Sequence, residues 1–258
     1  MAPLYFDVSG SAYGRFMGRF SEPLAQEFLE LVGARPGQRV LDVGSGAGAL
    51  TAVLVPVVGA DSVSAIDPSE PFVDTLRTRC PGVDVRLATA EDIPFPAATF
   101  DAVLAQLVVH FMSDPVQGLR EMARVAAPGG TVAANSWDHG GDRGPLSVFW
   151  QAARDLDPDA PDESDYAGVH EGDLARLFEV AGMTGATSTA LEVEVAHSDV
   201  DDWWEPYTLG VGPAGAYVAA LDPERRAALR AHCAELLPTG PFSTRAWAWT
   251  VVWTAPLG

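Results

Sequence analysis

The stretch Arg39–Thr51, RVLDVGSGAGALT, most constrains what this chain can fold into. It joins a short apolar run over residues 40–43, a glycine-rich turn over residues 44–48 and helical spacing from Ala49 onward. The glycines permit a tight turn at which a ligand can press against the main chain. The start of the following helix offers backbone N–H groups that have no partner within the helix. Strand, turn and helix in this order predict one edge of a nucleotide-type site in an α/β fold.

Asp42, which lies two residues before the glycine turn, bears on which class of cofactor the turn can bind. Residues 44–49 also fit the dinucleotide pattern G-x-G-x-x-G/A, but Asp42 places a carboxylate two residues before the first glycine. That charge would repel a pyrophosphate and attract a ligand that carries an ammonium group and no phosphate. The pattern D-x-G-x-G-x-G after an apolar strand resembles the first motif of the class I S-adenosylmethionine-dependent methyltransferases. This resemblance implies S-adenosyl-L-methionine as the cofactor, bound by Asp42 and by the turn residues Gly44, Ser45, Gly46 and Gly48.

A second acidic group follows the next expected strand, over residues 61–66. Asp67 lies 23 residues after Gly44 and precedes Pro68, near the spacing of about 20 residues at which an acidic group binds ribose hydroxyls. The two acceptor oxygens of a carboxylate suit a ribose diol. An Asp in the sequence D-P-S is also a common turn former, so a purely local role is the alternative.

Residues 90–103, AEDIPFPAATFDAV, strengthen the resemblance. They are similar to the A-E-D-(I/L)-P-F-x-D-x-(S/T)-F-D-x-V stretch of small-molecule methyltransferases of the ubiquinone/menaquinone biosynthesis type, with Ala97 in place of an Asp. The resemblance implies that Asp92 accepts a hydrogen bond from the adenine amino group and that the backbone of Ala90 and Glu91 lies beside the ring. An exposed acidic turn is the alternative.

The N-terminal segment SAYGRFMGRF, residues 11–20, precedes an expected helix over residues 22–32. In the family that the chain resembles, this region folds over the cofactor, which makes Tyr13 and Arg19 candidates for the methionine carboxylate. The alternative is that the aromatic residues of this segment pack on the sheet at helical spacing.

The expected strand over residues 102–105 ends at the same crevice as Asp42, because parallel strands present their carboxyl ends to one side. Gln106 and Leu107 should therefore line the methionine part of the cofactor. His110 is a candidate proton acceptor, and His139, after the fifth expected strand, is a second. Packing between its apolar neighbours is the alternative for His110.

The resemblance covers residues 11–137 and implies a doubly wound, mostly parallel seven-stranded sheet, the Rossmann-like methyltransferase fold, with an antiparallel last strand and a helical lid. We expect a single domain over residues 1–258. Its parts are an N-terminal helical cap (1–33), a cofactor-binding half (34–137) and lid or substrate-binding insertions (138–240), of which residues 172–196 return to the core. Residues 128–130, PGG, predict a sharp turn, and the Trp-rich alternation over residues 243–254 predicts an antiparallel edge strand.

Composition limits the partners. The net charge is −19 and all 16 basic residues are Arg, so the surface should repel nucleic acid and anionic lipid. No apolar run of about 18 residues and no signal peptide is present, which predicts a cytoplasmic protein without membrane contact. The two cysteines, Cys80 and Cys233, have no partner at metal-ligand spacing, so no metal site is expected.

These observations predict a methyltransferase that acts on a small molecule by in-line transfer. Aromatic residues in the second half suggest an apolar or planar acceptor held by a lid: Trp137, Trp150, Trp203, Trp204 and Tyr207. Two alternatives remain, a methyltransferase fold that binds S-adenosylmethionine without transferring its methyl group, and an NAD-dependent oxidoreductase. The sequence leaves the oligomeric state open between monomer and homodimer.

Overall fold

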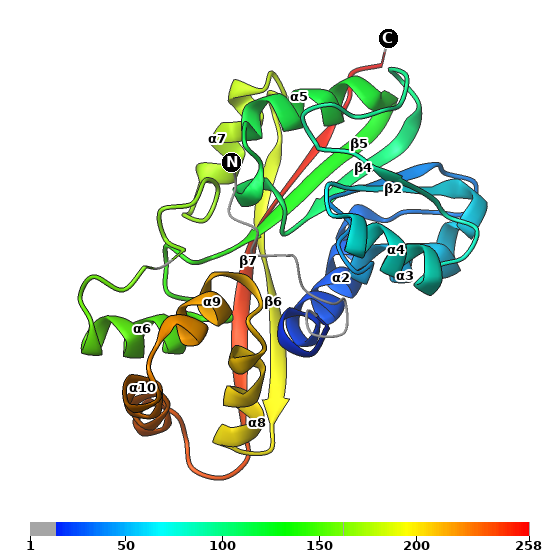
Figure 1. Ribbon diagram of the computed structural model, residues 1–258. Helices are drawn as coiled ribbons and strands as arrows, with labels where there is room; N and C mark the ends of the chain where they lie inside the picture. Colours follow the sequence, from blue (N-terminus) through cyan, green and yellow to red (C-terminus); the bar gives the residue numbers. More distant parts are fainter. Residues whose placement is uncertain (1–13, 162, 258) are drawn as a thin grey trace.

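The computed structural model describes residues 14–161 and 163–257. Its centre is one sheet of seven strands in the order β3-β2-β1-β4-β5-β7-β6 (Figure 1). The strands are β1 (Val40–Val43), β2 (Val63–Asp67), β3 (Asp84–Leu87), β4 (Phe100–Gln106), β5 (Ala126–Trp137), β6 (Thr187–His197) and β7 (Phe242–Thr254).

The strand directions confirm the predicted fold class. The pairs β1–β2, β1–β4, β2–β3 and β4–β5 are parallel, and β7 is antiparallel to both β5 and β6. The order reverses between β1 and β4, and in open sheets of this kind ligands bind at the carboxyl ends of the strands beside such a reversal.

Helices cover both faces of the sheet, as Figure 1 shows. One face carries α2 (Arg19–Val32), α3 (Ala49–Val58) and α4 (Glu70–Arg79), and the other carries α5 (Pro115–Val125) and α7 (Asp173–Val180). Phe28 and Leu54 are fully buried on the first face, and Met122 and Phe178 on the second. The central parallel strands β1 and β4 are therefore buried from both sides, which explains their mainly apolar sequences.

A third group of helices lies beside the long strands β6 and β7 (Figure 1). It comprises α6 (Ser147–Leu156), α8 (Val200–Trp204), the 3₁₀ turn η4 (Glu205–Leu209), α9 (Gly212–Ala220) and α10 (Pro223–Leu236). Its core contains four aromatic residues that the sequence suggested as acceptor contacts: Trp150, Trp203, Trp204 and Tyr207. That suggestion is wrong in part, since these side chains pack against one another and hold the helices together.

Of two local predictions, the turn at residues 128–130 has a counterpart and the edge position of residues 243–254 is wrong. Residues 127–130 lie within the bounds of β5 but bulge out of its pairing with β4, since Ala126 pairs with Phe100 and Thr131 with Ala102, and Gly129 has φ +75°. The Trp-rich strand β7 is an inner strand, and β6 forms the edge. The indole rings of β7 are half-buried, and the guanidinium carbon of Arg143 lies 5.2 Å from the ring centroid of Trp249.

Candidate functional site

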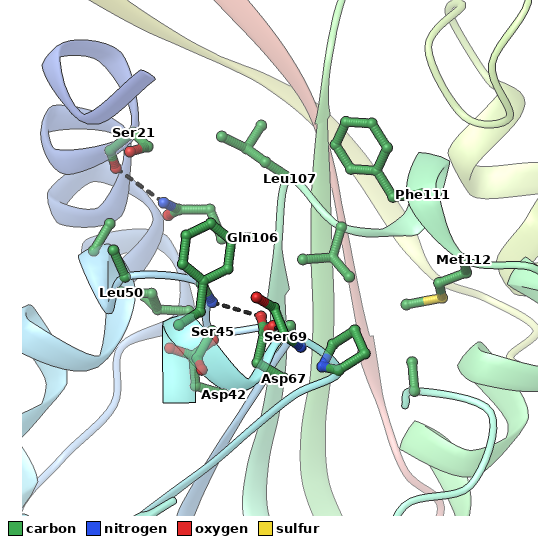
Figure 2. Close-up of a pocket in the computed structure, with 18 of the residues that line it drawn as sticks. Ser21, Asp42, Ser45, Leu50, Asp67, Ser69, Gln106, Leu107, Phe111 and Met112 are labelled. Carbon is green, nitrogen blue, oxygen red and sulfur yellow. Dashed lines mark hydrogen bonds between the residues drawn. The ribbon is translucent and has the colours of Figure 1, made fainter. Parts of the chain in front are cut away.

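A cavity of about 300 Å³ lies at the carboxyl ends of β1, β2 and β4 (Figure 2). The glycine turn after β1 forms its floor, with Asp42 and Asp67 at the ends of two neighbouring strands. The start of α2 and the segment after β4 line other parts of it. The sequence predicted a site at this place.

The turn needs glycine at two positions for different reasons. Gly44 has φ +68°, and a Cβ there would meet Val108 Cγ1 and Cγ2 at 2.5 Å. Gly48 has φ +87°, and a Cβ there would lie 2.4 Å from Leu76 Cδ1. Gly44 therefore brings the main chain close to the cavity lining, whereas Gly48 serves the packing of α3 on α4. Gly48 was predicted to contact the cofactor, but it is not among the cavity-lining residues.

Asp67 ties the turn to the end of β2. Its Oδ2 accepts a hydrogen bond from Gly46 N at 2.8 Å, and its Oδ1 accepts one from Ser69 N at 2.8 Å. Burial raises the pKa of Asp67, while the two backbone N–H groups act in the opposite direction. Each carboxylate oxygen has a further lone pair, so Asp67 can still accept hydrogen bonds from a ligand diol.

Asp42 lies deeper, 1% exposed, and its Oδ2 accepts a hydrogen bond from the Thr51 hydroxyl at 2.6 Å. Burial, with a smaller contribution from the charge of Asp67, raises the pKa of Asp42 to about 7. A cationic ligand group nearby would favour the ionised carboxylate, as Coulomb attraction is strong in a site that excludes water.

Three buried polar atoms of this cavity have no hydrogen-bond partner among the described residues: Ser21 Oγ, Ser45 Oγ and Gln106 Oε1. The amide nitrogen of Gln106 donates to Ser21 O at 2.9 Å, which fixes the side chain between β4 and α2 (Figure 2). Buried polar groups are normally satisfied, so these atoms indicate room for a polar ligand. Hydroxyl and amide oxygens can serve the ammonium and carboxylate ends of an amino acid.

On the opposite side, Ala90 and Glu91 line the cavity but Asp92 does not. Asp92 is exposed, because the turn after β3 directs the preceding residues inward. Glu91 Oε1 accepts hydrogen bonds from Ser113 N at 2.8 Å and Asp114 N at 3.2 Å, which holds the segment before α5. The predicted contact of Asp92 with an adenine amino group therefore has no counterpart in this arrangement.

Two N-terminal residues, Tyr13 and Arg19, were also predicted to contact the cofactor. Tyr13 lies outside the described residues. Arg19 is absent from the cavity lining, because its guanidinium binds the Asp202 carboxylate and the carbonyl oxygen of Ala196. Pro68 does line the cavity, as do Ser45, Gly46, Gln106 and Leu107 among the other predicted residues.

A second, smaller cavity contains both predicted histidines. His110 and His139 line it, and it shares Leu107 and Phe111 with the first cavity. The ring centroids of the two histidines are 6.3 Å apart, and His110 Nδ1 lies 3.3 Å from Ser136 Oγ. Burial and the neighbouring His139 lower the pKa of His110 to about 3. At neutral pH His110 is therefore an uncharged imidazole that can accept a hydrogen bond from a ligand group.

Leu107 lies at the junction of the two cavities in a left-handed conformation, with φ +62°. Its backbone N–H donates to the side-chain oxygen of Asn135 at 3.0 Å, and Asn135 is fully buried. Non-glycine residues in this conformation are strained and concentrate at functional sites. The carboxyl end of β4 is thus held in an unfavourable shape where the cavities meet.

The sequence did not predict several lining residues. Ser21 of the first cavity lies inside α2, and Glu163 of the second cavity lies between α6 and α7. Phe72 and Met112, which also line the first cavity, look in sequence like ordinary core residues. Neither position carries a motif, and only the fold brings them to the site.

Within residues 14–161 and 163–257, no cluster of three or more His, Cys, Asp or Glu side chains could hold a metal ion. No helix in this part of the chain is long and apolar enough to cross a membrane.

The cofactor half of the chain matches known proteins. A family model described as a methyltransferase domain matches residues 41–134. An uncharacterized methyltransferase of Mycobacterium tuberculosis is 41% identical over 124 residues, which make up 48% of this chain and 49% of that protein. A demethylmenaquinone methyltransferase of Renibacterium salmoninarum is 35% identical over 111 residues, 43% of this chain and 46% of that protein. The chain spans about half the length of the curated relatives it matches.

The similarity of fold extends further than the similarity of sequence. The crystal structure of the YcgJ protein from Bacillus subtilis superposes with a TM-score of 0.59 at 20% identity, covering 92% of this chain and 99% of that one.

The sheet order and the matched domain together show the Rossmann-like methyltransferase fold. Residues 41–134 match a methyltransferase domain, and enzymes of ubiquinone/menaquinone biosynthesis are relatives of this part of the chain. S-adenosylmethionine is the methyl donor of this family. The match to a methyltransferase domain favours S-adenosylmethionine over NAD as the cofactor.

Proposed function

We propose that this chain binds S-adenosylmethionine in the first cavity and transfers its methyl group to a small molecule in the second. The observation that carries the proposal is that the two cavities are adjacent and share the lining residues Leu107 and Phe111. A donor and an acceptor placed on either side of this junction would be aligned and shielded from water, which is the main requirement of an in-line transfer.

The residues of the first cavity fit this cofactor. Ser21, Ser45 and Gln106 offer unpartnered polar atoms, and Asp67 offers carboxylate oxygens at the end of β2. A bound S-adenosylmethionine supplies an electrophilic methyl group on a positively charged sulfur. Asp42, buried nearby, would stabilise positive charge in this cavity.

In the second cavity, His110 would accept a hydrogen bond from an acceptor hydroxyl or amine. Its low pKa keeps the imidazole uncharged and ready to accept a hydrogen bond, although it also makes His110 a weak base. We therefore assign His110 mainly to orientation of the acceptor, with His139 as its neighbour. An acceptor that is nucleophilic without losing a proton first would need no stronger base.

Calorimetric titration of the purified protein with S-adenosylhomocysteine and, separately, with NAD tests the cofactor assignment. We expect micromolar binding of the first and none of the second. Binding of NAD alone, or of neither, would refute the proposal. Incubation with methyl-labelled S-adenosylmethionine and a panel of small acceptors then tests transfer, and tight cofactor binding without S-adenosylhomocysteine formation would favour the non-transferring alternative.

A further inference from the structure

The second cavity contains a carboxylate that the proposed transfer does not use. Glu163 lines this cavity and is 4% exposed. Its Oε2 accepts a hydrogen bond from the indole nitrogen of Trp150 at 3.0 Å. Most of the other lining residues are apolar, among them Phe16, Trp137 and Val211. Glu163 is therefore a buried acidic group that faces a mainly apolar space.

No positive charge from the described residues compensates Glu163. None of the ion pairs found in residues 14–161 and 163–257 includes it, and the indole N–H that it accepts is a neutral donor. Its other oxygen accepts no hydrogen bond within the same part of the chain. Burial of an unpaired carboxylate is costly, and a cation that enters the cavity would relieve that cost.

The remaining surroundings also favour a cation. Phe16, Phe111 and Trp137 line the same cavity, and aromatic rings attract ammonium groups that lie over their faces. The uncharged imidazole of His110 would not repel such a group. The net charge of −19 raises the local concentration of cations around the whole protein.

We propose that the second cavity binds an apolar or aromatic acceptor through a protonated amine that anchors it, with Glu163 as the counter-ion; the methyl group goes to another, unprotonated nucleophilic atom of the acceptor. This inference rests on the proposed function, since it names the class of acceptor for that site. The cavity volume of about 40 Å³ holds only a few heavy atoms, so the ammonium head enters while the larger body lies toward the opening. Glu163 determines specificity and takes no part in the transfer itself.

The test uses three probes of the same shape and different charge: phenethylamine, 2-phenylethanol and phenylacetate. Each is titrated into the full chain, with and without saturating S-adenosylhomocysteine, at pH 7.5. The variants are Glu163→Gln, whose amide oxygen can still accept from Trp150, and Glu171→Gln, which removes an exposed carboxylate from the same connecting segment.

We expect the unsubstituted protein to bind phenethylamine at least tenfold more tightly than the alcohol and not to bind phenylacetate. Glu163→Gln should reduce the preference for the amine to less than twofold, and Glu171→Gln should leave it unchanged. Absence of amine binding, equal binding of the alcohol, or a preference that survives Glu163→Gln would each overturn the inference. Even if Glu163→Gln does not fold, equal binding of the amine and the alcohol by the unsubstituted protein would overturn the inference.

Titration of S-adenosylhomocysteine alone distinguishes an error in the assignment of Glu163 from an error in the proposed function. If the cofactor product binds and the amine has no advantage, only the assignment of Glu163 is wrong. If S-adenosylhomocysteine does not bind, the proposed function itself is wrong.

Discussion

Replacement of Asp67 by Asn tests the first cavity most directly. Both carboxylate oxygens of Asp67 already accept backbone N–H groups, from Gly46 and from Ser69. An Asn has one acceptor oxygen, so one of these N–H groups would face an amide NH₂ and lose its partner. Loss of a buried hydrogen-bond partner costs about 1–3 kcal/mol of folding free energy. A substitution at this position is therefore not neutral for folding, and binding and stability must be measured on the same sample.

The effect of Asp67→Asn on ligand binding can be measured separately from its effect on folding. If Asp67 accepts hydrogen bonds from the ribose diol, loss of the charged acceptor should weaken S-adenosylhomocysteine binding by about 1.5–3 kcal/mol, roughly 10- to 100-fold in Kd. Calorimetric titration gives the affinity and thermal unfolding gives the stability. Because the charge of Asp67 also helps to raise the pKa of Asp42, the Asn variant should lower that pKa as well.

A matched control is Asp61→Asn, which makes the same change at an exposed position before the opposite end of β2. We expect its affinity for S-adenosylhomocysteine to equal that of the unsubstituted protein. An Asp67→Asn variant that is folded and binds within twofold of the unsubstituted protein would remove Asp67 from the site. Equal weakening by both variants would mean that overall charge, and not a local contact, controls binding.

Three further outcomes are expected. Because the pKa of Asp42 is raised to about 7, affinity for S-adenosylhomocysteine should fall as the pH drops from about 8 to about 6 and the carboxylate becomes protonated; calorimetry that shows no pH dependence would contradict this. Gly48→Ala should lower the free energy of unfolding, measured with denaturant, by about 1–3 kcal/mol, because Gly48 has a positive φ and its new Cβ would meet Leu76 of α4. Gly46→Ala should lower it by less, because its Cβ meets nothing within 4 Å. Hydrogen bonds to Asp155 and Glu235 raise the pKa of His232. The protonated imidazole therefore stabilises the folded protein fully below pH 6.5, and this stabilisation is lost as the pH rises through the raised pKa. In a His232→Gln variant, Tm should fall less steeply over the same pH range.

The cofactor half of the fold could be predicted because the residues that specify its strand, turn and helix start are consecutive in the sequence. A buried strand, a turn that needs positive φ and a helix start occupy consecutive residues, and Asp67 repeats the pattern one strand later. Parallel strands then bring both carboxylates to one edge without further information. The failures in this half concern single side chains: the path of the turn leaves Asp92 exposed, and Asp202 holds Arg19 elsewhere.

The acceptor half could not be predicted in the same way, because its site is assembled from distant segments. Glu163 follows α6, His110 follows β4, and Phe16 precedes α2, yet all three line one cavity. Nothing in the local sequence of Glu163 separates it from the neighbouring acidic residues that face solvent. The same argument explains why the tryptophans of α8 were misread, since aromatic residues serve a hydrophobic cluster and a ligand pocket equally well in composition.

The cofactor cavity and the acceptor cavity are built in different ways, and this difference determines which of them a substitution can change. The turn at Gly44 and the backbone contacts of Asp67 leave little freedom, because a Cβ or a lost carboxylate oxygen disturbs the main chain itself. The second cavity is formed by side chains on helices that are held together by their own aromatic cluster. A substitution such as Glu163→Gln can therefore alter the charge of the acceptor cavity while the sheet and the first cavity keep their shape. On this reasoning, acceptor specificity and cofactor binding should respond independently to mutation, with Leu107 and Phe111 as the residues at which the two effects meet.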